Sequence, residues 1–302
     1  MRIAIPRETH PGENRIPIVP ADAKKLVRLG AEVVVEAGMG QSAGFSDEEY
    51  TEAGATLNND HDELLGGADV LLRLRKPQIE EIAKLKNGAI HISYLDPFNE
   101  HDLVHAFRDA KVTAISMEMI PRTTRSQKMD ALSSQANLAG YMTVILAAAN
   151  LPRILPMMMT PAGTLKPANV FVIGAGVAGL QAIATAKRLG AKVVAFDTRP
   201  VVAEQVQSLG AKFLEIDLGE TGETEGGYAR ELTPEQVEKQ RQAQKETIAK
   251  SDVVITTAQV FGRKPPVLVT KDMVEGKATG SEFVDKAAEA GGNGEGSEHD
   301  EV

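Results

Sequence analysis

Cysteine is absent from the 302-residue sequence. Its absence excludes disulfide bonds, thiolate metal ligands and cysteine nucleophiles, and it fits a reducing compartment. An excess of positive charge is also missing, since 33 Lys and Arg residues stand against 42 Asp and Glu residues. The net charge of −9 argues against a surface that follows the phosphates of a nucleic acid.

Long hydrophobic runs are missing as well. The longest apolar stretch with almost no charge covers residues 138–151, which is shorter than the roughly 18 residues of a membrane-spanning helix. The N-terminus carries no apolar segment typical of a signal peptide. We therefore expect a cytoplasmic protein without direct membrane insertion, and the length suggests two domains.

Short apolar runs alternate with amphipathic segments in both halves of the chain. This alternation predicts an α/β protein with parallel sheets and crossover helices. The predicted strands are 3–5, 32–35, 70–74, 89–93, 112–116, 169–173, 192–196, 212–216 and 252–257. The predicted helices are 21–29, 47–53, 78–85, 100–110, 130–150, 177–189, 201–209 and 234–250, and the long helix 130–150 connects the two halves.

Three segments show no regular period. Prolines interrupt residues 156–167, so we expect an irregular segment there, with the methionines at 157–159 in the core or between the domains. Residues 217–233 are rich in Gly, Glu and Thr and are typical of a mobile loop. The end of the chain, 286–302, reads as a flexible acidic tail.

A glycine motif follows one of the predicted strands. Residues 174–179 read Gly-Ala-Gly-Val-Ala-Gly and open the helix 177–189, and Asp197 ends the next predicted strand. This is the arrangement of a dinucleotide site: Gly174 permits a tight turn, Gly176 lets the backbone approach the pyrophosphate, and Gly179 allows close packing. Asp197 suits the ribose hydroxyls and favours NAD(H) over NADP(H), although Arg199 nearby could accommodate a 2′-phosphate. The alternative is a glycine-rich turn that binds no cofactor.

The predicted cofactor-binding set contains the glycine loop and the ends of the neighbouring strands. Tyr228, in the loop 217–233, is the aromatic residue that could stack on a ligand if that loop is a lid rather than a solvated segment. The full set is Gly174, Gly176, Val177, Ala178, Gly179, Asp197, Thr198, Arg199, Tyr228, Thr257 and Ala258.

A second polar region covers residues 121–134. Its side chains Arg122, Gln127, Asp130 and Ser133 offer hydrogen bonds suited to a carboxamide and a ribose. They could equally form a capped helix start, with Asp130 or Ser126 as the cap. We predict no metal site: His101 and His105 are spaced for one helix face, but two surface histidines explain them better.

Four segments resemble one known family. They are residues 5–15 (Ile-Pro-Arg-Glu-Thr-His-Pro-Gly-Glu-Asn-Arg), 117–122 (Met-Glu-Met-Ile-Pro-Arg), 133–141 (Ser-Ser-Gln-Ala-Asn-Leu-Ala-Gly-Tyr) and 176–190. They resemble the NAD(H)-binding alpha subunit, or domain I, of proton-translocating NAD(P)⁺ transhydrogenase. The resemblance implies two Rossmann-like doubly wound parallel-sheet domains joined by a long helix, as in alanine dehydrogenase. It implies the domains 1–135 and 136–285, followed by the tail.

The resemblance also implies a reaction. Hydride would pass directly from NADH on this chain to NADP⁺ on a beta subunit, while a third, membrane-spanning component passes protons. The catalytic set implied is Arg122, Gln127, Asp130 and Ser133. A homodimer, attached to the inner face of the membrane through its partners, is the implied assembly.

Two alternatives use the same fold. One is a non-catalytic or decayed NAD-binding protein, because family members continue beyond residue 302 and the first domain would then lack its usual return segment. Lys277, Glu282 and Lys286 also stand where apolar residues are expected. The other is an alanine-dehydrogenase-like enzyme. Arg75 and Asp96 disfavour it, because they stand where that enzyme needs a lysine and a histidine. Arg15 of the family pattern is retained, but one cationic contact does not make an amino-acid site.

Overall fold

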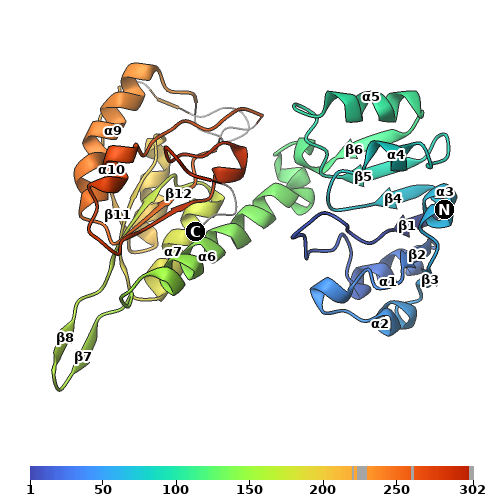
Figure 1. Ribbon diagram of the computed structural model, residues 1–302, viewed down its shortest axis with the longest axis horizontal. Coiled ribbons are helices and arrows are strands. Elements are labelled where there is room, and N and C mark those ends of the chain that lie inside the picture. The colour runs from blue at the N-terminus through green and yellow to red at the C-terminus, as the bar shows by residue number, and fades with distance from the viewer. Residues whose placement is uncertain (220, 223–229, 260–261, 299–302) are drawn as a thin grey trace. The chain divides into compact units, whose positions relative to one another are not determined.

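The computed structural model describes residues 1–219, 221–222, 230–259 and 262–298 (Figure 1). The chain divides into two compact units, Met1–Ala131 and Leu132–Val302. Each unit is an α/β structure built on a parallel sheet, as the alternating pattern predicts. In the described part of the chain, no helix combines the length and the hydropathy needed to cross a bilayer.

The sheet of the first unit has the strand order β3-β2-β1-β4-β5-β6. Its strands are β1 (Arg2–Ile5), β2 (Glu32–Glu36), β3 (Thr56–Asn58), β4 (Val70–Leu72), β5 (Ile90–Ser93) and β6 (Thr113–Ser116). Its helices are α1 (Pro20–Arg28), α2 (Asp47–Glu52), α3 (His61–Gly67), α4 (Ile79–Ile82) and α5 (His101–Asp109), with short 3₁₀ turns at Gln41–Ala43, Met117–Met119 and Thr124–Met129.

Helices cover both faces of this first sheet. On one face, α1 and α2 pack Ala23 and Tyr50 against Ile3, Ile5 and neighbouring strand residues. On the other, α3, α4 and α5 pack a second apolar cluster against the sheet. Because successive side chains of a strand point to opposite faces, β1 supplies Ile3 and Ile5 to one cluster and Ala4 to the other.

The sheet of the second unit has the order β11-β10-β9-β12-β13. Its strands are β9 (Asn169–Ile173), β10 (Lys192–Phe196), β11 (Lys212–Phe213), β12 (Val253–Thr256) and β13 (Glu282–Asp285), and a separate hairpin is formed by β7 (Met158–Thr160) and β8 (Gly163–Leu165). Its helices are α6 (Ala131–Asn150), α7 (Val177–Arg188), α8 (Ala203–Ser208), α9 (Pro234–Ala249) and α10 (Lys271–Glu275), with 3₁₀ turns at Pro200–Val202 and Ala288–Ala290.

This second sheet is also doubly wound. Residues of α6, α7 and α8 share one apolar cluster with β9, β10 and β12. Residues of α9 and α10, including Ile248 and Met273, share the other cluster with Phe171, Ile173 and Phe196. The order turns back at β9, so the loops after β9 and β12 emerge on either side of the reversal point where such folds bind ligands.

Several elements differ from the sequence prediction. β3, α3, α10 and β13 were not expected, and the irregular segment 156–167 contains the β7–β8 hairpin. The methionines at 157–159 are not core residues, because they are 60%, 48% and 80% exposed. A two-stranded hairpin has no second layer of its own to bury them.

The C-terminal segment differs from the expected flexible tail as far as residue 298. Asn293 is completely buried, and its side-chain amide donates to the carbonyl oxygens of Ala258 and Pro266, both at 2.9 Å. The Asp285 carboxylate accepts the backbone N–H groups of Asn293 and Gly294 at 2.7 and 2.9 Å. These contacts place the segment against the loop after β12. The predicted domain boundaries themselves remain a prediction.

Candidate functional site

The glycine motif that joins β9 to the first turn of α7 requires glycine at two of its three glycine positions. Gly174 has φ +99°, which L side chains rarely adopt, and a Cβ there would lie 2.7 Å from the Thr257 hydroxyl oxygen. A Cβ on Gly179 would fall on the carbonyl oxygen of Gly174. The first and third glycines therefore make the turn and the close helix–strand contact, as their spacing predicts.

The middle glycine, Gly176, has a different surrounding. A Cβ there would meet nothing nearer than the Arg199 Nη2 atom at 4.0 Å. Gly176 caps α7 without any side-chain hydrogen bond, so the first backbone N–H groups of this 12-residue helix have no capping side chain. Open space in front of a helix N-terminus suits a phosphate group, which a larger side chain would displace.

Asp197 lies directly after β10, beside the same loop. The residue is 8% exposed, and its Oδ2 atom accepts the backbone N–H of Ala175 at 2.7 Å. Its carboxylate also binds the backbone and side chain of Arg199. Thr198 contributes its carbonyl oxygen, which accepts the Thr221 hydroxyl at 2.7 Å. The acid predicted to bind a ribose is thus hydrogen-bonded to the glycine loop through Ala175.

The loop after β12 completes this end of the second sheet. The Thr257 hydroxyl donates to the carbonyl oxygen of Gly174 at 3.0 Å, and the Thr257 N–H donates to Ile173. Ala258 follows, and its carbonyl oxygen is held by Asn293. The structure therefore brings the described members of the predicted cofactor set together at the reversal point of one sheet. Tyr228, the remaining member, lies outside the described residues.

Helix α6 approaches the glycine-loop helix very closely. A Cβ on Gly140 would collide with the carbonyl oxygen of Ala178 in the first turn of α7. The available sequence signal for this contact was a single glycine in the middle of an Ala- and Leu-rich helix, where glycine is unfavourable unless backbones must meet.

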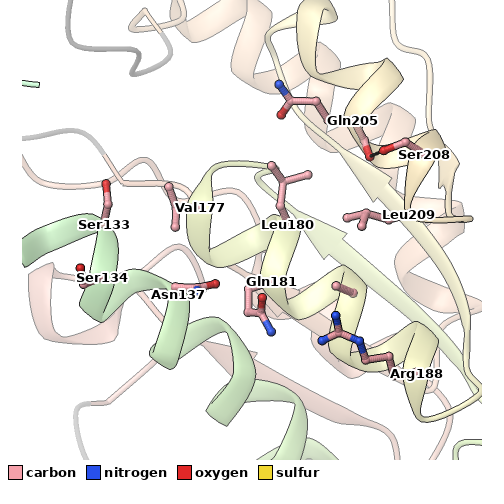
Figure 2. Close-up of a pocket in the computed structure, with 11 residues that line it drawn as sticks. Ser133, Ser134, Asn137, Val177, Leu180, Gln181, Arg188, Gln205, Ser208 and Leu209 are labelled. Atoms are coloured by element: carbon pink, nitrogen blue, oxygen red, sulfur yellow. Dashed lines mark hydrogen bonds between the residues drawn. The ribbon is translucent and has the colours of Figure 1, made fainter. Parts of the chain in front are cut away.

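A groove of about 550 Å³ follows α7 between α6 and α8 (Figure 2). Ser133, Ser134 and Asn137 of α6 line it together with Val177, Leu180 and further residues of α7 and α8. Figure 2 shows Ser133 and Val177 at the same end of this groove. Ser133, predicted as a catalytic residue, therefore lies beside the first turn of the glycine-loop helix.

The other predicted catalytic residues belong to the first unit. Arg122 and Asp130 form an ion pair, with Nε and Oδ2 3.6 Å apart, and both side chains are mostly buried. Gln127 lies between Arg122 and Asp130 in the sequence, in the 3₁₀ turn Thr124–Met129. Its carbonyl oxygen accepts the Asp130 N–H at 3.3 Å. Asp130 directly precedes α6, which is the position of a residue that starts a helix.

The residues that distinguish an alanine-dehydrogenase-like site, Arg15, Arg75 and Asp96, all have partners among their neighbours. The Glu13 carboxylate binds Arg15, with Oε1–Nε 2.8 Å, and Arg75, with Oε2–Nε 2.8 Å. Burial raises the pKa of Glu13, but the hydrogen bonds from both arginines outweigh it and lower the pKa to about 2. Asp96 binds the Asn99 amide at 2.8 Å. Two arginines that share one buried carboxylate form a charge-compensated cluster.

The histidines at 101 and 105 are both exposed on α5. Within the ranges that the structure describes, no three His, Asp or Glu residues gather in a way that could hold a metal ion.

Comparisons with known proteins agree with this geometry. The family model for the N-terminal domain of alanine dehydrogenase/PNT matches residues 4–139, and the model for the C-terminal domain of the same family matches residues 143–302. Together they cover nearly the whole chain. The fold and the site define a protein of the alanine dehydrogenase/PNT family, and the chain belongs to this family.

Within the family, similarity is greater on the transhydrogenase side. The chain is 48% identical over 300 residues to an NAD(P) transhydrogenase alpha subunit of Rhodospirillum rubrum, covering 97% of this chain and 78% of that protein. Identity to an alanine dehydrogenase of Mycobacterium tuberculosis is 30% over 303 residues, with 98% and 75% covered. A solved transhydrogenase structure from Sinorhizobium meliloti superposes with a TM-score of 0.89 at 45% identity, covering all of this chain and 83% of that one.

Proposed function

We propose that the chain is the NAD(H)-binding subunit of a proton-translocating transhydrogenase. In this role it holds NADH while hydride passes directly to NADP⁺ on a separate beta subunit. The observation that carries the proposal is the open space at Gly176, the N-cap of α7, where a Cβ would meet nothing nearer than the Arg199 Nη2 atom that binds the buried Asp197. The similarity to transhydrogenase alpha subunits supports the same role.

The residues of the second unit have distinct tasks in this proposal. The N–H groups at the start of α7 bind the pyrophosphate, and Asp197 binds the adenosine ribose. Thr257 and Ala258 border the site on the side of β12, and Ser133 borders it on the side of α6. The negative charge of Asp197 disfavours a 2′-phosphate, so NAD(H) is preferred over NADP(H).

The residues of the first unit orient the nicotinamide in this proposal. Arg122 and Asp130, already paired, position the carboxamide, and Gln127 extends towards the second nucleotide. Bound NADH supplies the hydride, so the chain needs no general acid or base of its own. Its residues hold the ring in place and exclude water. We also propose a homodimer, bound on the cytoplasmic face of the membrane through its partner subunits.

Two other functions use the same site. A non-catalytic NAD-binding protein would bind NADH without passing hydride onward. An alanine-dehydrogenase-like enzyme is disfavoured because Glu13 already compensates Arg15 and Arg75, and because Asp96 stands where the resemblance places that enzyme's histidine.

Isotope transfer tests the proposal. The full chain is mixed with an NADP(H)-binding transhydrogenase subunit, with NADP⁺ and with NADH carrying deuterium at the transferable position, and the NADPH formed is analysed by mass spectrometry. Deuterium in NADPH, and none in the solvent, supports direct transfer. NADH binding without transfer favours the non-catalytic alternative. The matched control is Gly176→Val, which removes transfer if the glycine loop is the NADH site.

A further inference from the structure

Asp197 is fully engaged by donors of its own chain. Its Oδ1 atom accepts the backbone N–H and the Nε–H of Arg199, both at 2.9 Å. Its Oδ2 atom accepts the Ala175 N–H at 2.7 Å and the Nη2–H of Arg199 at 3.0 Å. Four hydrogen bonds therefore converge on one carboxylate.

A carboxylate offers about four lone-pair sites, and a guanidinium binds two of them in a fork. Arg199 and Ala175 together use all four. The side chains are also well covered, with 6% of Asp197 and 12% of Arg199 exposed. A ribose that donates hydroxyl groups to Asp197 would find no oxygen lone pair available while the Arg199 fork is in place.

We propose that Arg199 is a specificity-determining residue of the nucleotide site, whose guanidinium holds both oxygens of Asp197 and has to release them before an adenosine ribose can bind. This inference rests on the proposed function, because it assumes that a dinucleotide occupies the glycine loop. For Asp197 to be released, the two side-chain bonds that Arg199 donates to it must break. The bonds from the Ala175 and Arg199 backbones remain and keep Asp197 in place.

The consequence for NADH is a weakened apparent affinity. If only a small fraction of molecules has Asp197 released, the dissociation constant is raised by the inverse of that fraction. A released fraction of about one tenth corresponds to a tenfold weaker affinity. Removing the guanidinium therefore strengthens NADH binding, which is opposite to the effect expected if Arg199 were an ordinary nucleotide ligand.

The pair of Asp197 and Arg199 also determines whether NADPH can bind. While Asp197 is charged, it both repels a 2′-phosphate and retains the arginine that could bind one. Asn at position 197 keeps an oxygen that can accept the Ala175 N–H but loses the charge that holds Arg199. The neutral amide holds the guanidinium less strongly, so a 2′-phosphate can compete for it, and Asp197→Asn should acquire NADPH binding that depends on Arg199.

Fluorescence titrations of NADH and NADPH test the inference on the full chain. The proteins are the natural chain, Arg199→Met, Asp197→Asn, the double variant, and Lys192→Met as a control that removes an exposed cation from the other end of β10. Thermal melts of each protein identify any variant that fails to fold. We expect Arg199→Met to bind NADH about tenfold more tightly, with no such gain in the Asp197→Asn background. Lys192→Met should behave like the natural chain.

Each result has one meaning. Unchanged or weaker NADH binding by folded Arg199→Met, when the natural chain binds NADH, overturns the inference and leaves the proposed function standing. NADPH binding by Asp197→Asn that survives the added Arg199→Met also overturns it. If none of the folded proteins binds NADH, both the inference and the proposed function fail.

Discussion

The two units place an acidic residue at the same point of the same topology, but they use it differently. Glu36 ends β2 and Asp197 follows β10, and each of these strands pairs with the first strand of its sheet. Each carboxylate accepts a backbone N–H from the loop after that first strand, from Arg7 at 2.9 Å and from Ala175 at 2.7 Å. The acid alone therefore does not define a nucleotide site.

The loops next to these acids account for the difference. After β9 the chain has three glycines, and the space at Gly176 is open. After β1 the chain reads Pro-Arg-Glu, and the Arg7 side chain binds Glu36 at 3.0 Å. His61 binds the same carboxylate at 2.9 Å. Both acids therefore pair with an arginine, Glu36 with Arg7 and Asp197 with Arg199, but the loop of the second unit also leaves open space, at Gly176.

The largest effect should come from adding one carbon to the glycine loop. Gly179→Ala places a Cβ on the carbonyl oxygen of Gly174, so we expect a loss of about 3 kcal/mol in the free energy of unfolding of the second unit. Urea denaturation measures this loss. Gly176→Ala is the matched control and should retain stability, because its Cβ meets no atom nearer than 4.0 Å. Equal stability of the two variants would contradict the account of the loop.

A larger side chain at Gly176 should weaken NADH binding without unfolding the protein. Gly176→Val fills the space in front of α7, and we expect about 100-fold weaker NADH binding because the pyrophosphate can no longer approach the backbone. Titration of NADH measures the affinity, and the thermal melting temperature should change little. Unaltered affinity would place the nucleotide elsewhere.

Removing the charge of Glu36 and removing the charge of Asp197 should have different effects, the first on stability and the second on NADH binding. Burial raises the pKa of Glu36, but hydrogen bonds from His61 and Arg7 lower it overall, so the ionised form stabilises the fold above its unfolded pKa near 4.5. Glu36→Gln should cost roughly 1–3 kcal/mol at pH 7, as for a buried charged hydrogen bond, and leave NADH affinity unchanged. Asp197→Asn should weaken NADH binding. Loss of NADH binding in Glu36→Gln would contradict this division.

Acid should destabilise the first unit through His91. Burial, with Arg73 nearby, lowers the pKa of His91 from 6.5 to about 3. The unfolded chain therefore binds a proton that the folded chain does not, and stability falls as the pH drops from about 6.5 towards 3. The contribution is at most about 1.4 kcal/mol per pH unit. His91→Gln should flatten the dependence of urea midpoints on pH between 6.5 and 4, and an unchanged slope would argue against a neutral buried imidazole.

The smallest effect should come from Lys277. Its ammonium donates to the Ser251 carbonyl oxygen at 2.9 Å, and burial lowers its pKa to about 8. At pH 7 the folded chain thus carries a poorly solvated charge, which is relieved only as the pH rises from 8 towards 10.5. Lys277→Met should raise the melting temperature by a few degrees at pH 7, whereas the exposed Lys250 replaced by Met should not. A lower melting temperature for Lys277→Met would mean that the charge stabilises the fold.

Much of this architecture could be predicted from the sequence, because apolar β-rich runs and amphipathic helices each carry a clear period. β9, α7 and β10 lie within one residue of their predicted bounds. The elements that escaped prediction have weak local signals: β3 has three residues, and α3 ends in Gly66 and Gly67. β13 carries a charge at each end and is set by pairing with β12 rather than by its own composition.

The geometry of the candidate site was predictable where the backbone demands particular residues. Glycines at fixed spacing and an acid after the next strand indicated the loop correctly. The bond between Arg199 and Asp197, the closeness of Gly140 to Ala178 and the burial of Asn293 depend on tertiary contacts. No local pattern encodes such contacts.

The most direct test of the central claim is an equilibrium titration of the full natural chain with NADH, with NADPH in parallel. Our account predicts saturable NADH binding, much weaker NADPH binding, and loss of the NADH signal in the stably folded Gly176→Val variant. No saturable NADH binding by a chain that melts cooperatively would contradict the claim that this glycine loop is a working nucleotide site.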